Sequence, residues 1–197
     1  DAGTPGDASD DLSSTDTFTI TVSAVNDAPA LGSLDGTTLA YTEGDGAVVV
    51  DSSDVSSVSD ADSTDFDGGS LTVALTNGTS NDTLSVASDG TITLDSGTVY
   101  YDATGSSLTT TSIGTVSGGN SGTDLVVTLN SDSTSAGLTA LMQAVTYANG
   151  SDNPDTTDRT ATFTLDDGDG GSSTASAAVT ITVASENDAP TISNLNG

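Results

Sequence analysis

The sequence alternates apolar residues with threonine or serine at every second position over several separate stretches. The alternation is clearest in "TFTITVS", "GSLTVALT", "DLVVTLN", "RTATFTLD" and "SAAVTITVA". Successive side chains of a β-strand point to opposite faces of a sheet, so such a segment can bury one face and expose the other to solvent. The pattern is typical of half-buried antiparallel strands. We therefore predict an all-β fold.

Composition alone would favour disorder. Aromatic residues make up 4% of the 197 residues, and the formal net charge is −28 at pH 7. Both values are typical of chains that bury little apolar surface. A chain of this length is nevertheless long enough to bury a core. Because the alternation is regular, we expect a folded chain whose core is built from Val, Leu, Ile and Ala.

Ten strands and one helix are expected between residues 26 and 185. The strands are expected at 38–42, 47–51, 70–76, 83–87, 91–94, 98–102, 125–130, 144–148, 159–166 and 176–184. The segment "STSAGLTALMQAV" departs from period two, because Leu138, Leu141, Met142 and Val145 recur at helical spacing. It predicts a helix of about two turns that packs on the sheets.

Several residue types are missing, and their absence excludes functions. The chain has no His and no Cys, and its one basic residue is Arg159. Without a basic surface it is not expected to bind nucleic acid. Without His it lacks the commonest general base and transition-metal ligand, and without Cys it has no disulfides. No apolar run approaches about 18 residues, so membrane insertion is not expected.

The chain repeats part of its own sequence. "TITVSAVNDAP" at residues 19–29 returns as "TITVASENDAP" at residues 180–190, so Asp27 and Asp188 stand 161 residues apart. A fixed internal period of this kind is the signature of a tandem array of structural units.

The period divides the chain into three parts. We expect residues 1–25 to be the C-terminal strands of a preceding repeat, residues 26–185 to be one complete repeat, and residues 186–197 to be linker and the start of the next repeat. Pro29 and Pro190 fix their own φ and favour extended backbone before them. This suits a straight connection between stacked units.

Carboxylates gather in loops between the expected strands. "SDADSTDFDGG" contains Asp60, Asp62, Asp65 and Asp67, "LDDGDGG" contains Asp166, Asp167 and Asp169, and "GDASDD" contains Asp7, Asp10 and Asp11. Two carboxylates about 4 Å apart repel by roughly 4 kcal/mol at an effective dielectric of about 20. Flexible loops of hard oxygen ligands suit Ca²⁺ better than Mg²⁺, which needs a strict octahedron. A solvated acidic surface without metal is the alternative.

These features, taken in order, resemble a known family. "DAD" at residues 60–62, "YTEGD" around Glu43, "DDGDG" before the last strand and the two "NDAP" linkers resemble the cadherin-like repeats of giant bacterial surface adhesins, of the RTX type exported by type I secretion. The resemblance covers the full repeat and both linkers. It implies a cadherin-like or immunoglobulin-like antiparallel β-sandwich with one short helix, in a tandem array.

The resemblance also implies where calcium would bind. In cadherin-like arrays Ca²⁺ lies between successive domains, held by acids of both domains and of the linker. For the first junction the matching residues are Asn26, Asp27, Asp60 and Asp62, with help from Asp7, Asp10 or Asp11. For the second junction they are Glu43, Asp166, Asp167, Asp169, Asn187 and Asp188. Asp67, in the same loop as Asp60, is a further candidate ligand.

Two classes of function follow. The first is a calcium-stiffened extracellular spacer in a cell-adhesion protein, whose partners are the neighbouring repeats of the same polypeptide and, through other domains, glycans or cell-surface ligands. The alternative is a glycan-binding module or a glycosylated building block of an extracellular filament. We do not expect an enzyme. Paired acids such as Asp166 and Asp167 could resemble the two carboxylates of a glycoside hydrolase, but such a pair needs a cleft that holds one acid at a raised pKa. Loop aspartates at the end of a domain rarely have such a cleft.

Overall fold

The computed structural model describes residues 15–53, 56–105, 110–170 and 174–190, and it confirms the all-β prediction. Within these residues there are thirteen strands and one helix. Their bounds are β1 Ala30–Gly32, β2 Thr37–Thr42, β3 Val48–Val49, β4 Ser57–Ser59, β5 Ser70–Thr76, β6 Asp82–Val86, β7 Ile92–Asp95, β8 Thr98–Tyr101, β9 Thr111–Gly118, β10 Leu125–Leu129, α1 Ser135–Gln143, β11 Val145–Asn149, β12 Arg159–Asp166 and β13 Thr174–Ala184.

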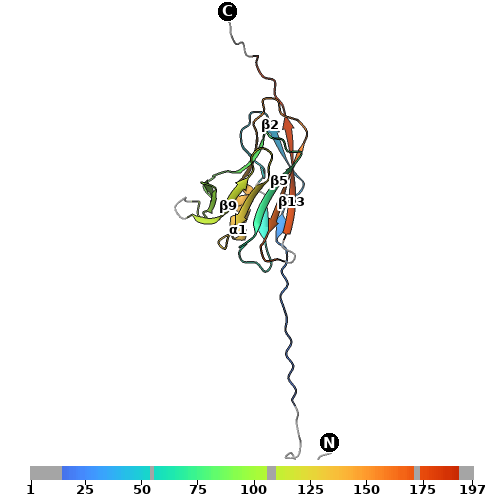
Figure 1. Cartoon of the computed structure of the whole chain (residues 1–197), viewed down its shortest axis with the longest axis vertical. Helices are drawn as coiled ribbons and strands as arrows, with labels where there is room; N and C mark the ends of the chain where they lie inside the picture. Colours follow the sequence, from blue (N-terminus) through green and yellow to red (C-terminus); the bar gives the residue numbers. More distant parts are fainter. Residues whose placement is uncertain (1–14, 54–55, 106–109, 171–173, 191–197) are drawn as a thin grey trace, which may run out of the picture.

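The strands form three sheets in a sandwich-like arrangement (Figure 1). The largest sheet has the order β2-β13-β12-β5-β10-β9-β8-β7, a second has the order β3-β11-β6, and β1 pairs with β4. The pairings between described strands are antiparallel, except that β13 runs parallel to β2. The parallel pair joins the last described strand to one of the first.

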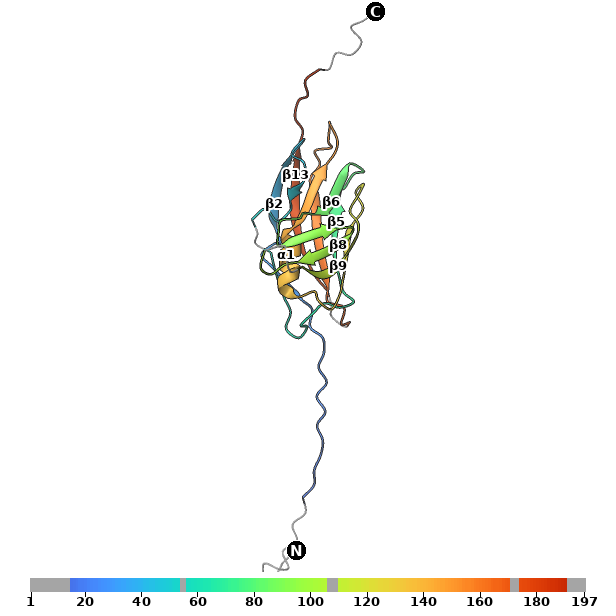
Figure 2. The same cartoon turned by 90° about the vertical axis from the view of Figure 1, so that its left-hand side faces the viewer.

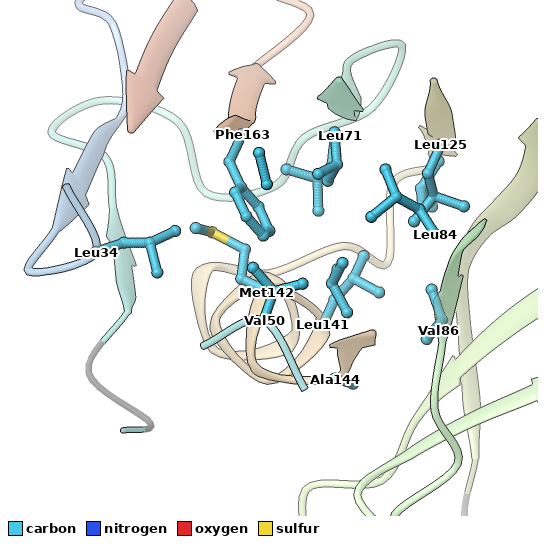
Figure 3. Packing of buried hydrophobic residues seen from close by; sticks show 14 of the residues in the cluster. Leu34, Val50, Leu71, Leu84, Val86, Leu125, Leu141, Met142, Ala144 and Phe163 are labelled. Atoms are coloured by element: carbon cyan, nitrogen blue, oxygen red, sulfur yellow. The ribbon is translucent and has the colours of Figure 1, made fainter. Parts of the chain in front are cut away.

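One hydrophobic core lies between the sheets and beneath α1. In β12 the apolar residues Ala161, Phe163 and Leu165 are buried while the threonines between them are partly exposed, as the alternation predicted. Figure 3 shows Phe163 of β12 pointing toward Met142 of α1. The core contains few aromatic residues and rests mainly on aliphatic ones.

The helix lies where the helical spacing predicted it. Thr134 caps its start, since the Thr134 hydroxyl accepts a hydrogen bond from the backbone N–H of Gly137 at 3.2 Å. Leu138 and Met142 are buried with the rest of the predicted stripe. The helix ends at Gln143, so the fourth predicted position, Val145, is buried from β11 instead.

β1, β4 and β9 lie outside the strands expected from the alternation. β1 and β4 are three residues long, which is too short for a period to be visible. In β9 a Cβ on Gly114 would lie 2.5 Å from the carbonyl oxygen of Thr128 on the neighbouring strand β10. Close approach of the two strands requires glycine there, and the glycine interrupts the apolar pattern.

The segment "TFTITVS" at residues 17–23 forms no strand within the described chain. It is extended and exposed, and no strand of the sandwich pairs with it in the part of the chain that the structure describes. A strand requires a neighbour that satisfies its backbone N–H and C=O groups. The expectation that residues 1–25 are the C-terminal strands of a preceding repeat stays a prediction, since the neighbouring strands would belong to that repeat.

The chain enters and leaves the sandwich at opposite ends. Figures 1 and 2 show residues 15–29 extending from one end and residues 185–190 from the other. We call these the entry end and the exit end. β13 carries the chain from the entry end to the exit end over its eleven residues.

Arg159, the only basic residue of the chain, lies inside the sandwich near the exit end. It is fully buried, and its Nε donates a hydrogen bond to Oδ2 of the fully buried Asp82 at 3.3 Å. Its Nη1 donates to the carbonyl oxygen of Asp155 at 2.6 Å and to that of Thr157. A buried charge is tolerated when it is paired and hydrogen-bonded, so Arg159 serves the interior of the fold.

Asp82 is surrounded by donors. Oδ1 accepts hydrogen bonds from the Tyr147 hydroxyl at 2.5 Å and from Nδ2 of Asn149 at 2.6 Å, and Oδ2 accepts one from the backbone N–H of Thr79 at 2.6 Å. Burial raises the pKa of Asp82, but these hydrogen bonds and the charge of Arg159 together lower it below its ordinary value. The carboxylate therefore stays ionised inside the core.

Replacing Asp82 with Asn is expected to lower the free energy of unfolding by about 3–5 kcal/mol, because the Arg159 guanidinium is then buried without its counter-ion. Urea unfolding followed by circular dichroism measures the change. Asp158→Asn removes an exposed carboxylate next to the same strand and should cost less than about 0.5 kcal/mol. Equal losses in the two variants would contradict the role given to Asp82.

The Asp82 carboxylate should make the free energy of unfolding fall as the pH is lowered. Its folded pKa lies below the unfolded value of about 3.9, so its contribution is complete above that pH and is lost as the pH falls through the folded pKa. Unfolding free energies measured from pH 6 to pH 2 should therefore fall less steeply in Asp82→Asn than in the unsubstituted chain. Parallel slopes would show that Asp82 does not titrate with folding.

Candidate functional site

Two acidic loops lie side by side at the entry end. The first acidic loop (residues 60–69) leads into β5, and the second acidic loop (residues 167–170) follows β12. The two strands are antiparallel neighbours whose register pairs Ser70 with Asp166. Loops far apart in the sequence are thus brought together by the register of one strand pair.

Glycines allow the two loops to touch. A Cβ on Gly69 would lie 2.2 Å from the carbonyl oxygen of Asp166, and a Cβ on Gly168 would lie 2.3 Å from that of Asp67. Gly168 also has a φ of +88°, which other residues rarely adopt. The glycines of "DFDGG" and "DDGDGG" therefore interlock the loops.

The linker preceding the sandwich contacts both loops. Nδ2 of Asn26 donates hydrogen bonds to Oδ2 of Asp167 at 3.0 Å and to the carbonyl oxygen of Gly170 at 2.9 Å. The backbone N–H of Asp27 donates to the Asp62 carboxylate, at 3.3 Å to Oδ2 and 3.4 Å to Oδ1. The structure thus brings Asn26, Asp27 and Asp62, which were predicted to serve one junction, together at the entry end.

Asp60 folds the first acidic loop around one of its oxygens and leaves the other without a partner. Oδ1 accepts hydrogen bonds from the backbone N–H groups of Asp62 at 3.0 Å and Ser63 at 2.9 Å. Oδ2 is buried and has no hydrogen-bond partner among the described residues. A buried polar atom left unpaired costs free energy, so a donor or a cation that reached Oδ2 of Asp60 would be stabilising.

The pKa values of two neighbouring carboxyls in this loop, those of Asp60 and Asp62, shift in opposite directions. Burial raises the pKa of Asp60, but backbone hydrogen bonds from Ser63 and Asp62 outweigh it and the pKa lies below the ordinary value. Loss of hydration raises the pKa of Asp62, and the carboxylates of Asp60 and Asp27 raise it further. The carboxylates of Asp27, Asp60 and Asp62 therefore repel one another where the loop meets the linker, and the backbone hydrogen bond from Asp27 offsets this only in part.

The second acidic loop was predicted for the wrong junction. Asp166, Asp167 and Asp169 were expected to act with Glu43 at the exit end, but Asp167 contacts Asn26, and Oδ2 of Asp169 accepts a hydrogen bond from the Ser63 hydroxyl at 2.9 Å. The reason is the direction of β12, which ends at the entry end although it is late in the sequence. Asp167 itself is fully buried.

Four further candidate ligands remain, one in the first acidic loop and three in the N-terminal segment. Asp67 is exposed, and its backbone N–H donates to Oδ1 of Asp65 at 3.2 Å. Asp7, Asp10 and Asp11 lie outside the described residues.

A second acidic region lies at the exit end. Glu43, Asn187 and Asp188, predicted to act together, line one hollow of about 400 Å³. Oε2 of Glu43 accepts a hydrogen bond from the backbone N–H of Glu186 at 2.9 Å. Glu186 and Asp152 line the same hollow, and the motifs did not single them out. Glu186 directly precedes the repeated "NDAP" phrase, but the residue 161 positions earlier is Val25, so the repeat gave no signal for it.

Among the residues that the structure describes, no group of three or more acidic side chains is arranged to hold a metal ion. Calcium takes six to eight oxygen ligands, including carbonyl oxygens and water. A calcium ion at the entry end would therefore require the carboxylates of the two acidic loops to converge further than they do here.

Comparison with protein-family models, with curated protein sequences and with solved structures found no match. Within the described ranges, no helix combines the length and apolar character needed to cross a membrane.

Gly69→Ala is expected to lower the free energy of unfolding by about 1–3 kcal/mol, because the added methyl group forces the two acidic loops apart. Gly150→Ala is the matched control, since a Cβ there meets no atom within 4 Å. Thermal unfolding of both variants gives the comparison. A Gly69 variant as stable as the control would show that the loops are not interlocked.

Proposed function

We propose that this chain is a calcium-binding structural extender repeat of a large extracellular bacterial adhesin, built of cadherin-like units in tandem. In this proposal Ca²⁺ stiffens the junctions between units, and the array projects an adhesive end away from the cell. The units have no enzymatic activity. The 161-residue period of the sequence and the opposite positions of the entry and exit ends support the proposal.

The observation that carries the proposal is the contact between the linker and both acidic loops. Asn26 and Asp27 reach Asp167 and Asp62 through hydrogen bonds, beside the unpartnered Oδ2 of Asp60. Hydrogen bonds of this kind hold a linker less firmly than a shared ion would. A cation bound by both the linker and the loops would restrict the linker to a single orientation relative to the sandwich.

The residue types at the entry end suit calcium, with the further convergence of the two loops described above. Its side chains offer hard oxygen ligands on loops, which Ca²⁺ accepts in irregular geometry. Asp60, Asp62 and Asp27, with Asp167 and Asp169 of the second acidic loop, would hold the ion. When bound, the ion would neutralise carboxylates that the chain cannot pair with its own basic residue, since Arg159 is buried with Asp82.

The exit end would form the upper half of the next junction. Asn187 and Asp188 follow Asn26 and Asp27 by the 161-residue period. In an array they would therefore contact the acidic loops of the next unit, with Glu43 and the other carboxylates of the hollow beside them.

Calcium is expected to raise the melting temperature of this chain and EDTA to lower it. A ligand that binds only the folded state stabilises it by about 2.7 kcal/mol at a hundredfold excess over Kd. Scanning calorimetry of the chain with calcium, with magnesium and with EDTA measures the shift. A melting curve that EDTA leaves in place would rule out calcium binding under these conditions.

A pair of double variants locates the ion. Asp60→Asn with Asp62→Asn should remove most of the calcium-dependent shift, because both carboxylates belong to the first acidic loop. Asp95→Asn with Asp124→Asn removes the same charge from exposed positions outside the acidic loops and should keep the shift. An equal loss in both would mean that calcium acts through net charge alone.

The extender mechanism is tested by shape. In a protein with residues 26–186 present twice in tandem, which keeps the 161-residue spacing, calcium should increase the maximum dimension measured by small-angle X-ray scattering, because repulsion between loops is replaced by a shared ion. The Asp60→Asn, Asp62→Asn change in the second copy should abolish the increase. A dimension that is independent of calcium would contradict the mechanism even if calcium binds.

A further inference from the structure

Residues 17–25 carry an apolar stripe that nothing in the described sandwich covers. Phe18, Ile20 and Val22 are 84%, 73% and 87% exposed. They alternate with threonines, so that all three would lie on one face of a strand. Contiguous apolar surface of this kind on a soluble unit marks an interaction site.

The internal repeat identifies the counterpart of this stripe. Displacing Phe18, Ile20 and Val22 by 161 residues gives Val179, Ile181 and Val183 of β13. These three side chains are 0%, 0% and 6% exposed. The same sequence pattern is thus buried in one copy and bare in the other.

The surroundings of β13 show what buries it. β13 lies inside the eight-stranded sheet, parallel to β2 and antiparallel to β12. Ile181 is paired with Leu39 on one side and with Arg159 on the other. A strand with this pattern needs both neighbours, and one face of it needs a core.

We infer that residues 17–23 are the closing strand of a second sandwich unit of this same fold. In that unit the segment lies between a strand equivalent to β2, to which it is parallel, and a strand equivalent to β12, to which it is antiparallel. Phe18, Ile20 and Val22 enter the core of that unit, and Thr19 and Thr21 face outward. The inference rests on the proposed tandem array but not on calcium.

The partner must be a sandwich unit in which the position between the equivalents of β2 and β12 is vacant. A second copy of the described sandwich does not have this vacancy, because its own β13 lies there. The unit that precedes this one in an array fits, since the segment then runs directly through Asn26 and Asp27 into β1 at Ala30. The closing strand of one unit and the first strand of the next are separated by the linker alone.

The test is an extended chain in which a second copy of residues 26–177 stands directly before Thr17. This junction puts Thr17 in the place of Ala178 and keeps the 161-residue spacing. All measurements are made in EDTA, so that failure of the calcium proposal does not affect the result. A parallel chain carries Phe18→Val, which restores the side chain found at position 179.

Hydrogen exchange at the amides of residues 19–22 is the readout. In the original chain these amides should exchange within the fastest class, and in the extended chain they should be protected to the level of residues 180–183. Ile20→Asp in the extended chain should abolish this protection and unfold the added copy. Thr21→Asp, on the opposite face, should preserve both the protection and the fold.

Three results would overturn the inference. One is fast exchange at residues 19–22 in an extended chain whose added copy is folded. Another is an added copy that stays unfolded with either Phe or Val at position 18. The third is protection of residues 19–22 in the original chain together with dimers in sedimentation, which would show that a second copy of this chain covers the stripe.

Discussion

The antiparallel pairing of β5 with β12 is the constraint on which both ends of the unit depend. At the entry end its register joins Ser70 to Asp166 and so places the two acidic loops against each other. At the exit end it stops at Thr76 and Thr160, beside Arg159 at the start of β12. The turn that leaves β5 then delivers Asp82 to Arg159. One ladder therefore positions the acidic surface and the buried ion pair.

The distribution of charge follows from that arrangement. The chain has one cation against 29 acids, and the cation is used in the interior. The acids at the entry end are left with neutral donors, namely backbone N–H groups and the amide of Asn26. The Ser63 hydroxyl is a further neutral donor, to Asp169. Because the amide of Asn26 and the backbone N–H of Asp27 belong to the linker, the position of the linker and the charge of the loops are coupled. Any cation bound there acts on both.

The sequence predicted the long strands well because β5, β10, β12 and β13 bury one face each, and period two records this directly. It did not reveal β9, where close packing requires Gly114 and removes the apolar signal. The acidic residues were recognised by type, but Asp167 and Asp169 were assigned to the wrong end. Residue order does not show which way β12 runs; only the strand register does. The role of Arg159 was also invisible, since burial of a lone basic residue depends on Asp82, far away in the chain.

The parallel pairing of β2 with β13 has a mechanical consequence. β2 follows the entry linker and β13 leads into the exit linker, and the two strands run side by side in the same direction, with Thr37 to Thr42 paired to Val179 to Ala184. Tension applied through the two linkers pulls these strands in opposite directions along their length. Because the ladder hydrogen bonds run across the strands, the load is a shear shared by all of them, and they must break together rather than one after another.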